Sequence, residues 1–425
     1  MKFNRLQEFP NSMSKPLIFK GINKKGLIED EELTSGKNLD SEMIPALSPR
    51  KPIEAIKTLS SPQYFGIVNG KDYYVDGTGF YYDGVNKGTV TRGVKCIVDF
   101  NGNLIIFPDK KYYDYIEGVF GSFTGPDVDY ATVHYNRVFG IKGSDVRASK
   151  VGDFKEWEEF GGTEMDSWAA DVYSPGDFTG ITSYQDHVIF FKRDQMYELY
   201  GYTPSQFKII ESAKIGCVDN ESISEVQGML FFMSEKGVQT YSGGFPRNVS
   251  EKLNLSYVNK ASSIGDGRKY YTCIDGVTYM FDTWQNTWYP YMDKDIICFA
   301  KSQKEIFGLS KDGKIYKLDS GNELVNWEAT TKLFDDGLFN KKSIKSIKLR
   351  ARMDTGSELK VYISIDEGEF KLRKHVKNTE LYHKKQRDMK IIIPIKRAST
   401  YQIRFVGQGH SVVYGEKEIL IGSDR

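Results

Sequence analysis

The chain has 425 residues, with 58 Lys and Arg against 57 Asp and Glu, and its net charge at pH 7 is +1. Such a balance excludes a strong overall attraction to nucleic acid or to acidic membranes. Aromatic residues make up 14% of the chain and Gly occurs 40 times, which suits half-buried pleated surfaces joined by many turns. No long segment shows the helical spacing of apolar residues, so the pattern predicts an all-β protein.

Residues 1–59 differ from the rest of the chain. They contain one strand candidate, at 16–22, followed by a run of acidic residues at 29–32 and by Pro45, Pro49 and Pro52. Because proline lacks an N–H donor and fixes φ, this segment favours neither a helix nor a central strand. We interpret it as an extended N-terminal arm with one strand that wraps the outside of the protein. The early strand could close a ring of sheets by pairing with a late strand, which would remove an exposed edge.

Residues 60–322 contain related units of strand, tight turn and strand. In the clearest unit, residues 306–318, two apolar runs flank Lys311-Asp312-Gly313, and an Asp-Gly pair tolerates the positive φ of a tight hairpin turn. The seven units occupy 73–82, 104–113, 138–144, 188–200, 229–241, 270–281 and 306–318. Degenerate β repeats whose turns lie roughly thirty to fifty residues apart predict a β-propeller of about seven blades.

The least regular insert lies between the third and fourth units, at residues 153–171. An insert of this kind is a loop on one face of a propeller, where partner contacts are common. Alternatively, its two tryptophans, Trp157 and Trp168, fill gaps between blades.

After the repeats, in residues 323–425, several runs alternate apolar and polar residues. The clearest are 344–353 and 359–365, and further strand candidates lie at 389–395, 400–406 and 411–414. Five short strands joined by polar turns predict a small antiparallel β-sandwich as a second domain.

No pattern of catalytic, cofactor-binding or metal-binding residues stands out. The five histidines lack the spacing of a metal site, and there is no GxSxG or phosphate-binding loop. Asp127 and Asp129 could bind calcium through loop oxygens, although a calcium loop needs more acidic ligands in order. The four cysteines, Cys96, Cys217, Cys273 and Cys298, have no CxxC spacing, and we interpret them as small buried hydrophobic residues in a reducing compartment.

Two basic clusters lie in the C-terminal part of the chain. They are our candidates for contact with an acidic partner: Lys341, Lys342, Lys384, Lys385 and Arg387. Solubility is the alternative explanation. No signal peptide and no apolar run of about twenty residues is present, so we expect no membrane span.

Three passages resemble a known family. Residues 45–52 followed by repeats resemble the N-terminal arm of virion proteins of tailed phages and prophages of Gram-positive bacteria. Residues 177–204 are similar to their middle repeats, and residues 391–410 look like their C-terminal sandwich. More distantly, the architecture resembles the tail hub or nozzle proteins of short-tailed phages, also called packaged-DNA stabilisation proteins.

This resemblance implies a non-enzymatic structural component of a tail or neck that forms a homo-oligomeric ring and holds other virion proteins. The protein would be synthesised in the cytoplasm of the host bacterium and then found in the virion. It would have no cofactor, and nucleic acid would meet it only by passing through a channel. The main alternative is an adhesin that binds cell-surface glycan. A weaker alternative is a glycoside hydrolase, because propellers can carry carboxylates on a central channel.

Overall fold

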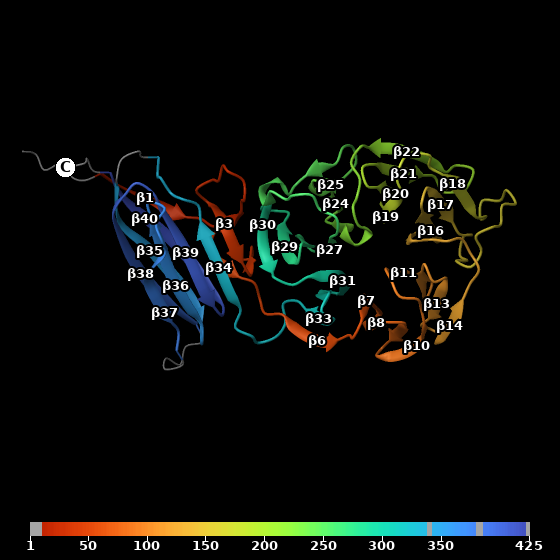
Figure 1. Cartoon of the computed structure of the whole chain (residues 1–425), viewed down its shortest axis with the longest axis horizontal. Helices are drawn as coiled ribbons and strands as arrows, with labels where there is room; N and C mark the ends of the chain where they lie inside the picture. Colours follow the sequence, from red (N-terminus) through yellow and green to blue (C-terminus); the bar gives the residue numbers. More distant parts are fainter. Residues whose placement is uncertain (1–10, 338–341, 380–385, 422–425) are drawn as a thin grey trace, which may run out of the picture.

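The computed structural model describes residues 11–337, 342–379 and 386–421. Over these ranges it is an all-β structure of 40 strands with two short 3₁₀ helices, η1 (Asn220–Ser222) and η2 (Glu251–Leu253), and no α-helix. The predicted fold class is confirmed at this level. Figure 1 shows a ring of sheets at one end of the molecule and two larger stacked sheets at the other. Nowhere in the described ranges is a helix long and apolar enough to cross a membrane.

The ring is a β-propeller built from four-stranded antiparallel sheets. Except in the last, all four strands of a sheet follow one another along the chain. The first three sheets consist of β7 (Pro62–Val68), β8 (Lys71–Asp76), β9 (Gly79–Tyr82) and β10 (Val85–Thr89); β11 (Cys96–Phe100), β12 (Asn103–Phe107), β13 (Lys111–Asp114) and β14 (Val119–Ser122); and β15 (Tyr130–His134), β16 (Arg137–Lys142), β17 (Asp145–Ala148) and β18 (Trp168–Asp171). The next three consist of β19 (Phe178–Tyr184), β20 (His187–Lys192), β21 (Met196–Tyr200) and β22 (Lys208–Ala213); β23 (Ser224–Val226), β24 (Met229–Ser234), β25 (Gly237–Tyr241) and β26 (Arg247–Asn248); and β27 (Ser262–Asp266), β28 (Lys269–Ile274), β29 (Val277–Asp282) and β30 (Thr287–Met292). The last sheet consists of β31 (Ile296–Ser302), β32 (Glu305–Ser310), β33 (Lys314–Lys317) and β6 (Glu54–Thr58).

The sequence repeats correspond to the two middle strands of these sheets. The unit at residues 270–281, for example, forms β28 and β29, paired from Lys269 with Asp282 to Ile274 with Val277. The intervening Asp275 and Gly276 have φ of 49° and 78°, the paired left-handed conformations that a two-residue hairpin turn needs. All six residues of β28 are buried, because neighbouring sheets cover a middle strand on both faces. The predicted hairpins are therefore present where the pattern placed them.

The series of sheets returns to its start. The first strands pack side by side: β11 against β15, β15 against β19, β23 against β27, β27 against β31, and β31 against β7. The closing strand is β6, which pairs antiparallel with β33. We expected the strand at 16–22 to close the ring, and that prediction is wrong, because those residues pair elsewhere. The propeller therefore also includes residues 54–58, which we had assigned to the arm.

The two stacked sheets form what we call the C-terminal unit. One has the strand order β1 (Asn11–Leu17), β40 (Ser411–Ile421), β35 (Lys342–Asp354) and β38 (Gln386–Ala398). The other has the order β2 (Lys20–Ile22), β3 (Glu32–Lys37), β34 (Asn326–Thr331), β39 (Tyr401–Gln408), β36 (Glu358–Ile365) and β37 (Lys371–Lys377). Strand β39 alternates strictly between buried and half-buried residues, as expected for one face packed on a core. Leu349 and Met353 from one sheet and Val361 and Phe405 from the other belong to one buried cluster.

The N-terminal arm is not an extended segment on the outside with a single strand. It contributes β1 to one sheet of the C-terminal unit and β2 and β3 to the other, and it forms a small two-stranded sheet from β4 (Leu39–Asp40) and β5 (Ser48–Pro49). Leu33, Leu39 and Leu47 are almost completely buried. The apolar residues of the arm are spaced too irregularly for a periodic pattern, yet each enters a core formed by distant parts of the chain.

The arm lies between the C-terminal unit and the propeller (Figure 1), where β2, β3 and β4 contact β30. An outermost propeller strand normally has one face in solvent, but all six residues of β30 are buried. Gly21, at φ +30°, lies so close that a Cβ would come within 2.7 Å of the Trp288 carbonyl oxygen. The Phe19 and Phe405 rings meet edge to face at 5.6 Å. One hydrophobic cluster therefore runs from the propeller through the arm into the C-terminal unit.

Buried charges fix the position of the arm on the propeller. The Lys269 ammonium lies 2.7 Å from the Asp40 carboxylate, and both side chains are nearly inaccessible. The neighbouring Ser41 hydroxyl donates a 2.6 Å hydrogen bond to Asp282, which also pairs with Arg268 at 3.1 Å. Burial raises the pKa of Asp40, and Lys269 opposes that rise. These pairs define where the arm contacts the propeller as well as contributing to its stability.

We predict that Lys269→Met strongly destabilises the protein, by about 3–5 kcal/mol, because it leaves the Asp40 carboxylate buried without its cation. The loss should be smaller near pH 5 than near pH 8, since protonation of Asp40 relieves the penalty. Urea unfolding midpoints at the two pH values measure both effects. The control is Lys214→Met, which removes an exposed partner of Glu211 and should cost at most about 0.5 kcal/mol. Equal losses for the two variants would contradict the prediction.

Candidate functional site

A cavity of about 850 Å³ lies on one face of the propeller. Its walls come from two sets of loops: those that lead from one sheet to the next, and the turns between the second and third strands of a sheet. An antiparallel sheet places both sets on the same face. For each sheet of the ring, residues of the sheet itself, of its middle turn or of the loop that leads into it line the cavity, among them Tyr64, Lys95, Tyr130, Arg193, Glu221, Ala261 and Ile297. The cavity is therefore the mouth of the central channel.

Two carboxyl groups lie in the cavity at the start of β23. Asp219 caps η1 by accepting a 3.1 Å hydrogen bond from the Glu221 backbone N–H. Burial, together with the nearby Asp219 charge, raises the pKa of Glu221 to about 8. Burial also raises the pKa of Asp219. Near neutral pH, Glu221 is therefore largely protonated and can donate as well as accept hydrogen bonds.

Two of the cations at the cavity are paired with the protein's own carboxylates. Lys95 is buried 2.6 Å from Asp109. Arg193 pairs with Glu235 at 2.7 Å and also donates to the Tyr257 hydroxyl at 2.8 Å. Lys260 and Lys311 also line the cavity, but so do Asp219, Glu221, Asp275 and Asp295, so positive charge is not concentrated there. In the described parts of the chain, no group of three or more His, Cys, Asp or Glu side chains could hold a metal ion.

The four cysteines are buried free thiols, as the sequence predicts. Two of them line the cavity: Cys298 donates to the Phe65 carbonyl at 3.0 Å, and Cys273 to the Lys294 carbonyl at 3.4 Å. Burial raises the pKa of Cys96 to about 12, so it remains a thiol rather than a nucleophilic thiolate.

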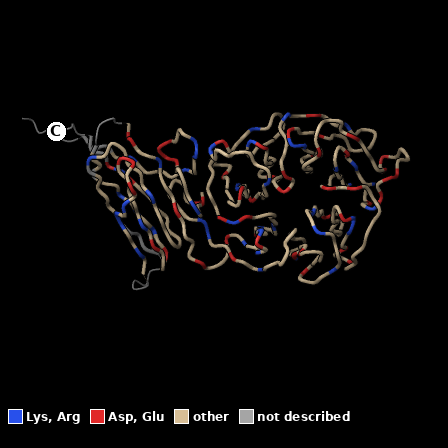
Figure 2. Tube along the Cα trace, in the orientation of Figure 1, with Lys and Arg blue, Asp and Glu red and all other residues tan. Residues whose placement is uncertain are grey.

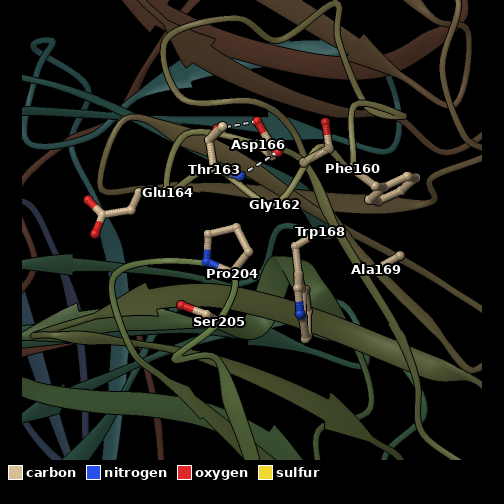
Figure 3. A pocket seen from close by; sticks show the side chains of 10 residues that line it. Phe160, Gly162, Thr163, Glu164, Asp166, Trp168, Ala169, Pro204 and Ser205 are labelled. Carbon is tan, nitrogen blue, oxygen red and sulfur yellow. Dashed lines mark hydrogen bonds between the residues drawn. The ribbon is translucent and has the colours of Figure 1, made fainter.

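A second concavity, of about 310 Å³, lies beside the insert in the third sheet (Figure 3). It lies between the loop 149–167, which joins β17 to β18, and the loop 201–207, which joins β21 to β22. Loops between third and fourth strands emerge on the face opposite the central cavity. Its lining residues are Phe160, Gly162, Thr163, Glu164, Asp166, Ser167, Trp168, Ala169, Pro204 and Ser205. We call this the insert pocket.

Arg137, a residue that the sequence did not single out, holds the insert in place. Its guanidinium is buried and donates to three backbone carbonyls, those of Ser149 at 2.9 Å, Glu164 at 2.6 Å, and Asp166. Burial lowers the pKa of Arg137. In the sequence Arg137 directly precedes the apolar run 138–141, but nothing there pointed to its burial or to its carbonyl partners.

The two tryptophans of the insert have different environments. Trp157 is buried, donates to the Phe154 carbonyl at 2.7 Å, and packs near Phe107 of the preceding sheet. For Trp157, the structure confirms the prediction that it fills a gap between sheets. Trp168 is only half-buried and lines the insert pocket.

Of the basic residues predicted to contact a partner, the structure places only the backbone of Lys342 and Arg387. Lys341, Lys384 and Lys385 lie outside the described residues, as do the side chains of Lys342 and Arg387. Backbone pairing places Lys342 opposite Ala398 and Arg387 opposite Met353. These positions are at opposite ends of the paired β35 and β38, about 36 Å apart at the rise of a strand. A single partner surface would have to span that length.

At the possible calcium loop, lysine side chains lie next to the two aspartate carboxylates. Asp127 lies 2.8 Å from Lys110 and 3.6 Å from Lys142, which also approaches Asp129 at 3.8 Å. The hydrogen bond from Lys110 lowers the pKa of Asp127. The lysine ammonium groups supply the positive charge that a calcium ion would have supplied.

No family model matches the chain, and no curated protein matches it. Among solved structures, BamB from Moraxella catarrhalis matches with a TM-score of 0.44 and 11% identity, over 68% of this chain and 98% of that one. A computationally designed protein, Ika8, matches with a TM-score of 0.44 and 9% identity, over 71% and 98%. An exo-β-1,3-galactanase from Phanerochaete chrysosporium reaches a TM-score of 0.27 and 9% identity, over 88% and 100%. At these TM-scores the likeness carries no argument about function.

We predict that Glu221→Gln changes the pH dependence of stability. The pKa of Glu221 is raised from about 4.5 to about 8 by folding, so its favourable contribution is complete below about pH 4.5 and is lost as the pH rises through about 8. The variant should match the parent near pH 5 and exceed it near pH 9 by on the order of 1 kcal/mol or more. Thermal unfolding across this range measures the difference, with the exposed Glu225→Gln as control. Parallel curves for parent and Glu221→Gln would contradict the assignment.

We also predict that Arg137→Met loosens the insert, because it leaves the carbonyls of Ser149, Glu164 and Asp166 without a buried donor. The expected loss of local stability is about 2–4 kcal/mol. Limited proteolysis and hydrogen exchange should show cleavage and faster exchange within 149–167. The matched control is Arg147→Met, which removes a half-exposed partner of Asp145 in the same sheet. Unchanged protection of 149–167 in Arg137→Met would refute the role of this residue.

Proposed function

We propose that this protein is a non-enzymatic structural component of a phage or phage-derived tail or neck. In this proposal it is a seven-bladed propeller followed by a β-sandwich, and it holds neighbouring virion proteins within a homo-oligomeric ring. The observation that carries the proposal is the arm, which completes both sheets of the C-terminal unit, packs on β30 and then supplies β6 to the propeller. Because one segment supplies strands to both units, the chain resists bending between them, as a load-bearing spacer must.

The resemblance of residues 45–52, 177–204 and 391–410 to virion proteins supports the same function. The propeller series has seven four-stranded sheets within the described residues.

Charge is divided unevenly between the two parts of the chain. Residues 323–425 carry 21 Lys and Arg against 14 Asp and Glu, whereas residues 1–322 carry 37 against 43. Figure 2 shows basic residues along the strands of the C-terminal unit. Opposite charges at the two ends of an elongated protomer favour a head-to-tail contact. Repeated head-to-tail contacts form a closed ring when the rotation between neighbouring protomers returns to its start.

The purified protein should therefore self-associate into closed rings, and the association should weaken as salt rises from about 0.05 M to about 0.5 M. Sedimentation and class averages of single particles measure this. A protein that stays monomeric at every concentration, or that cleaves a cell-wall polysaccharide, would count against the structural proposal.

Reversing charge at the predicted contact residues should reduce incorporation into particles. The variant is Lys384→Glu with Lys385→Glu, and its control is Lys208→Glu with Lys214→Glu, at exposed positions on the propeller. We expect the first pair to lower the copy number per particle several-fold without changing the circular dichroism, because it removes attraction to an acidic neighbour. Normal composition and infectivity with the first pair would exclude these lysines from the contact.

A further inference from the structure

Three loops meet on the propeller face opposite the central cavity. They are the turn between β15 and β16, the insert at 149–167 and the loop at 201–207. The Gly152 backbone N–H donates to the Asn136 carbonyl at 2.8 Å, which joins the first two loops. The Tyr135 and Tyr202 rings lie 4.9 Å apart, which joins the first and third. We propose that the insert pocket and these adjoining tyrosines bind a neutral saccharide.

The turn at Tyr135 displays an aromatic ring at a conformational cost. Tyr135 and Asn136 have φ of 44° and 56°, and the left-handed region is unfavourable for a bulky side chain. At the same turn of two other sheets the chain uses Asn69-Gly70 and Asn101-Gly102, which adopt this conformation readily. The Tyr135 side chain is nevertheless 45% exposed, so burial does not offset the cost. A strained backbone at a residue with an exposed ring indicates that the ring has a function at the surface.

Further aromatic residues line the pocket itself. Phe160 is 59% exposed, a high value for an apolar ring on a folded loop. Trp168 is held from behind by Phe207, whose ring meets the indole edge to face at 5.2 Å. Figure 3 shows Trp168 beside Pro204 and Ser205, with Phe160 above Ala169 at the right of the view. Rigid rings of this kind supply contact area with little loss of conformational entropy on binding.

The polar groups of the pocket are positioned in advance. Asp166 accepts a 2.8 Å hydrogen bond from the Thr163 backbone N–H and another from the Thr163 hydroxyl, which fixes the tip of the insert. Arg137 donates to the Glu164 carbonyl at 2.6 Å, and Glu164 lines the pocket with its carboxylate turned away from Pro204 (Figure 3). Carboxylate and hydroxyl groups beside aromatic rings match the two kinds of surface on a sugar, its hydroxyls and its C–H faces.

Charge selects a neutral ligand. The insert at 149–167 carries six acidic residues against two basic ones. An anionic polymer, such as nucleic acid or a phosphate-containing wall polymer, would be repelled there. The pocket volume of about 310 Å³ has room for one or two sugar rings, with Tyr135 and Tyr202 beyond its edge for a further one. This binding is additional to the proposed structural function and does not depend on it.

The test uses the full-length protein and a panel of neutral oligosaccharides built from glucose, galactose, rhamnose or N-acetylhexosamine units. Binding is followed by calorimetry and by saturation-transfer NMR, which reports the sugar protons in contact with protein. We expect at least one member of the panel to bind with a Kd in the micromolar to millimolar range. No binding by any member at millimolar concentration, or binding of polyphosphate in preference to the panel, would overturn the proposal.

Substitutions then locate the bound sugar. Trp168→Ala should abolish binding, and Phe160→Ala and Tyr202→Ala should each weaken it about tenfold, because each removes a stacking surface. Tyr173→Ala is the matched control, since this tyrosine is 91% exposed and lies outside the pocket, and its affinity should be unchanged. Since Phe160 and Tyr202 are surface residues, their variants should retain the parental melting temperature. Equal affinity in the parent, Phe160→Ala and Tyr202→Ala would place the sugar elsewhere and refute the site.

Discussion

The contact between the arm and β30 is the constraint on which the rest of the structure depends. It joins a buried ion pair, Asp40 with Lys269, to a strand whose six residues are all covered. A buried pair of this kind returns little net free energy, since both ions lose their water, but it penalises every arrangement in which the two charges are apart. The hydrophobic cluster around β30 supplies the stability, and the ion pair defines the position.

This arrangement makes the beginning and the end of the chain interdependent. Strand β1 pairs with β40 over seven residues, and β6 closes the propeller on β33. Both pairings join residues more than 250 positions apart, so they form only after long loops have closed. The same N-terminal segment therefore supplies an outermost strand to the last propeller sheet and to both sheets of the C-terminal unit.

The two concavities of the propeller differ in how their charges are used. In the central cavity, Lys95 and Arg193 are held by Asp109 and Glu235, and Glu221 avoids ionisation near neutral pH. In the insert pocket, the buried charge of Arg137 binds carbonyl oxygens and so shapes a loop. The ion pairs of the central cavity neutralise the channel mouth, whereas the contacts of Arg137 hold the loop that carries aromatic rings at the surface. Rigid display of rings is what recognition of a weakly interacting ligand requires.

The local structure of this protein follows from short-range patterns in its sequence. Period-two alternation and Gly- or Asn-containing turns located the middle hairpins, as at Asp275-Gly276, because strand direction and turn conformation depend on neighbours in the chain. The burial of the cysteines and the all-β class followed from the same short-range patterns. Tertiary structure alone decided the role of the arm: nothing near Asp40 in the sequence indicates Lys269, and nothing near Leu33 or Leu39 indicates the cores that they enter. Tertiary structure also decided the contacts of Arg137 and the shape of the insert pocket. Arg137 binds backbone carbonyls, and the pocket lies between loops of neighbouring sheets. Such long-range pairings depend on which surfaces meet when the ring closes, and no local periodicity records that.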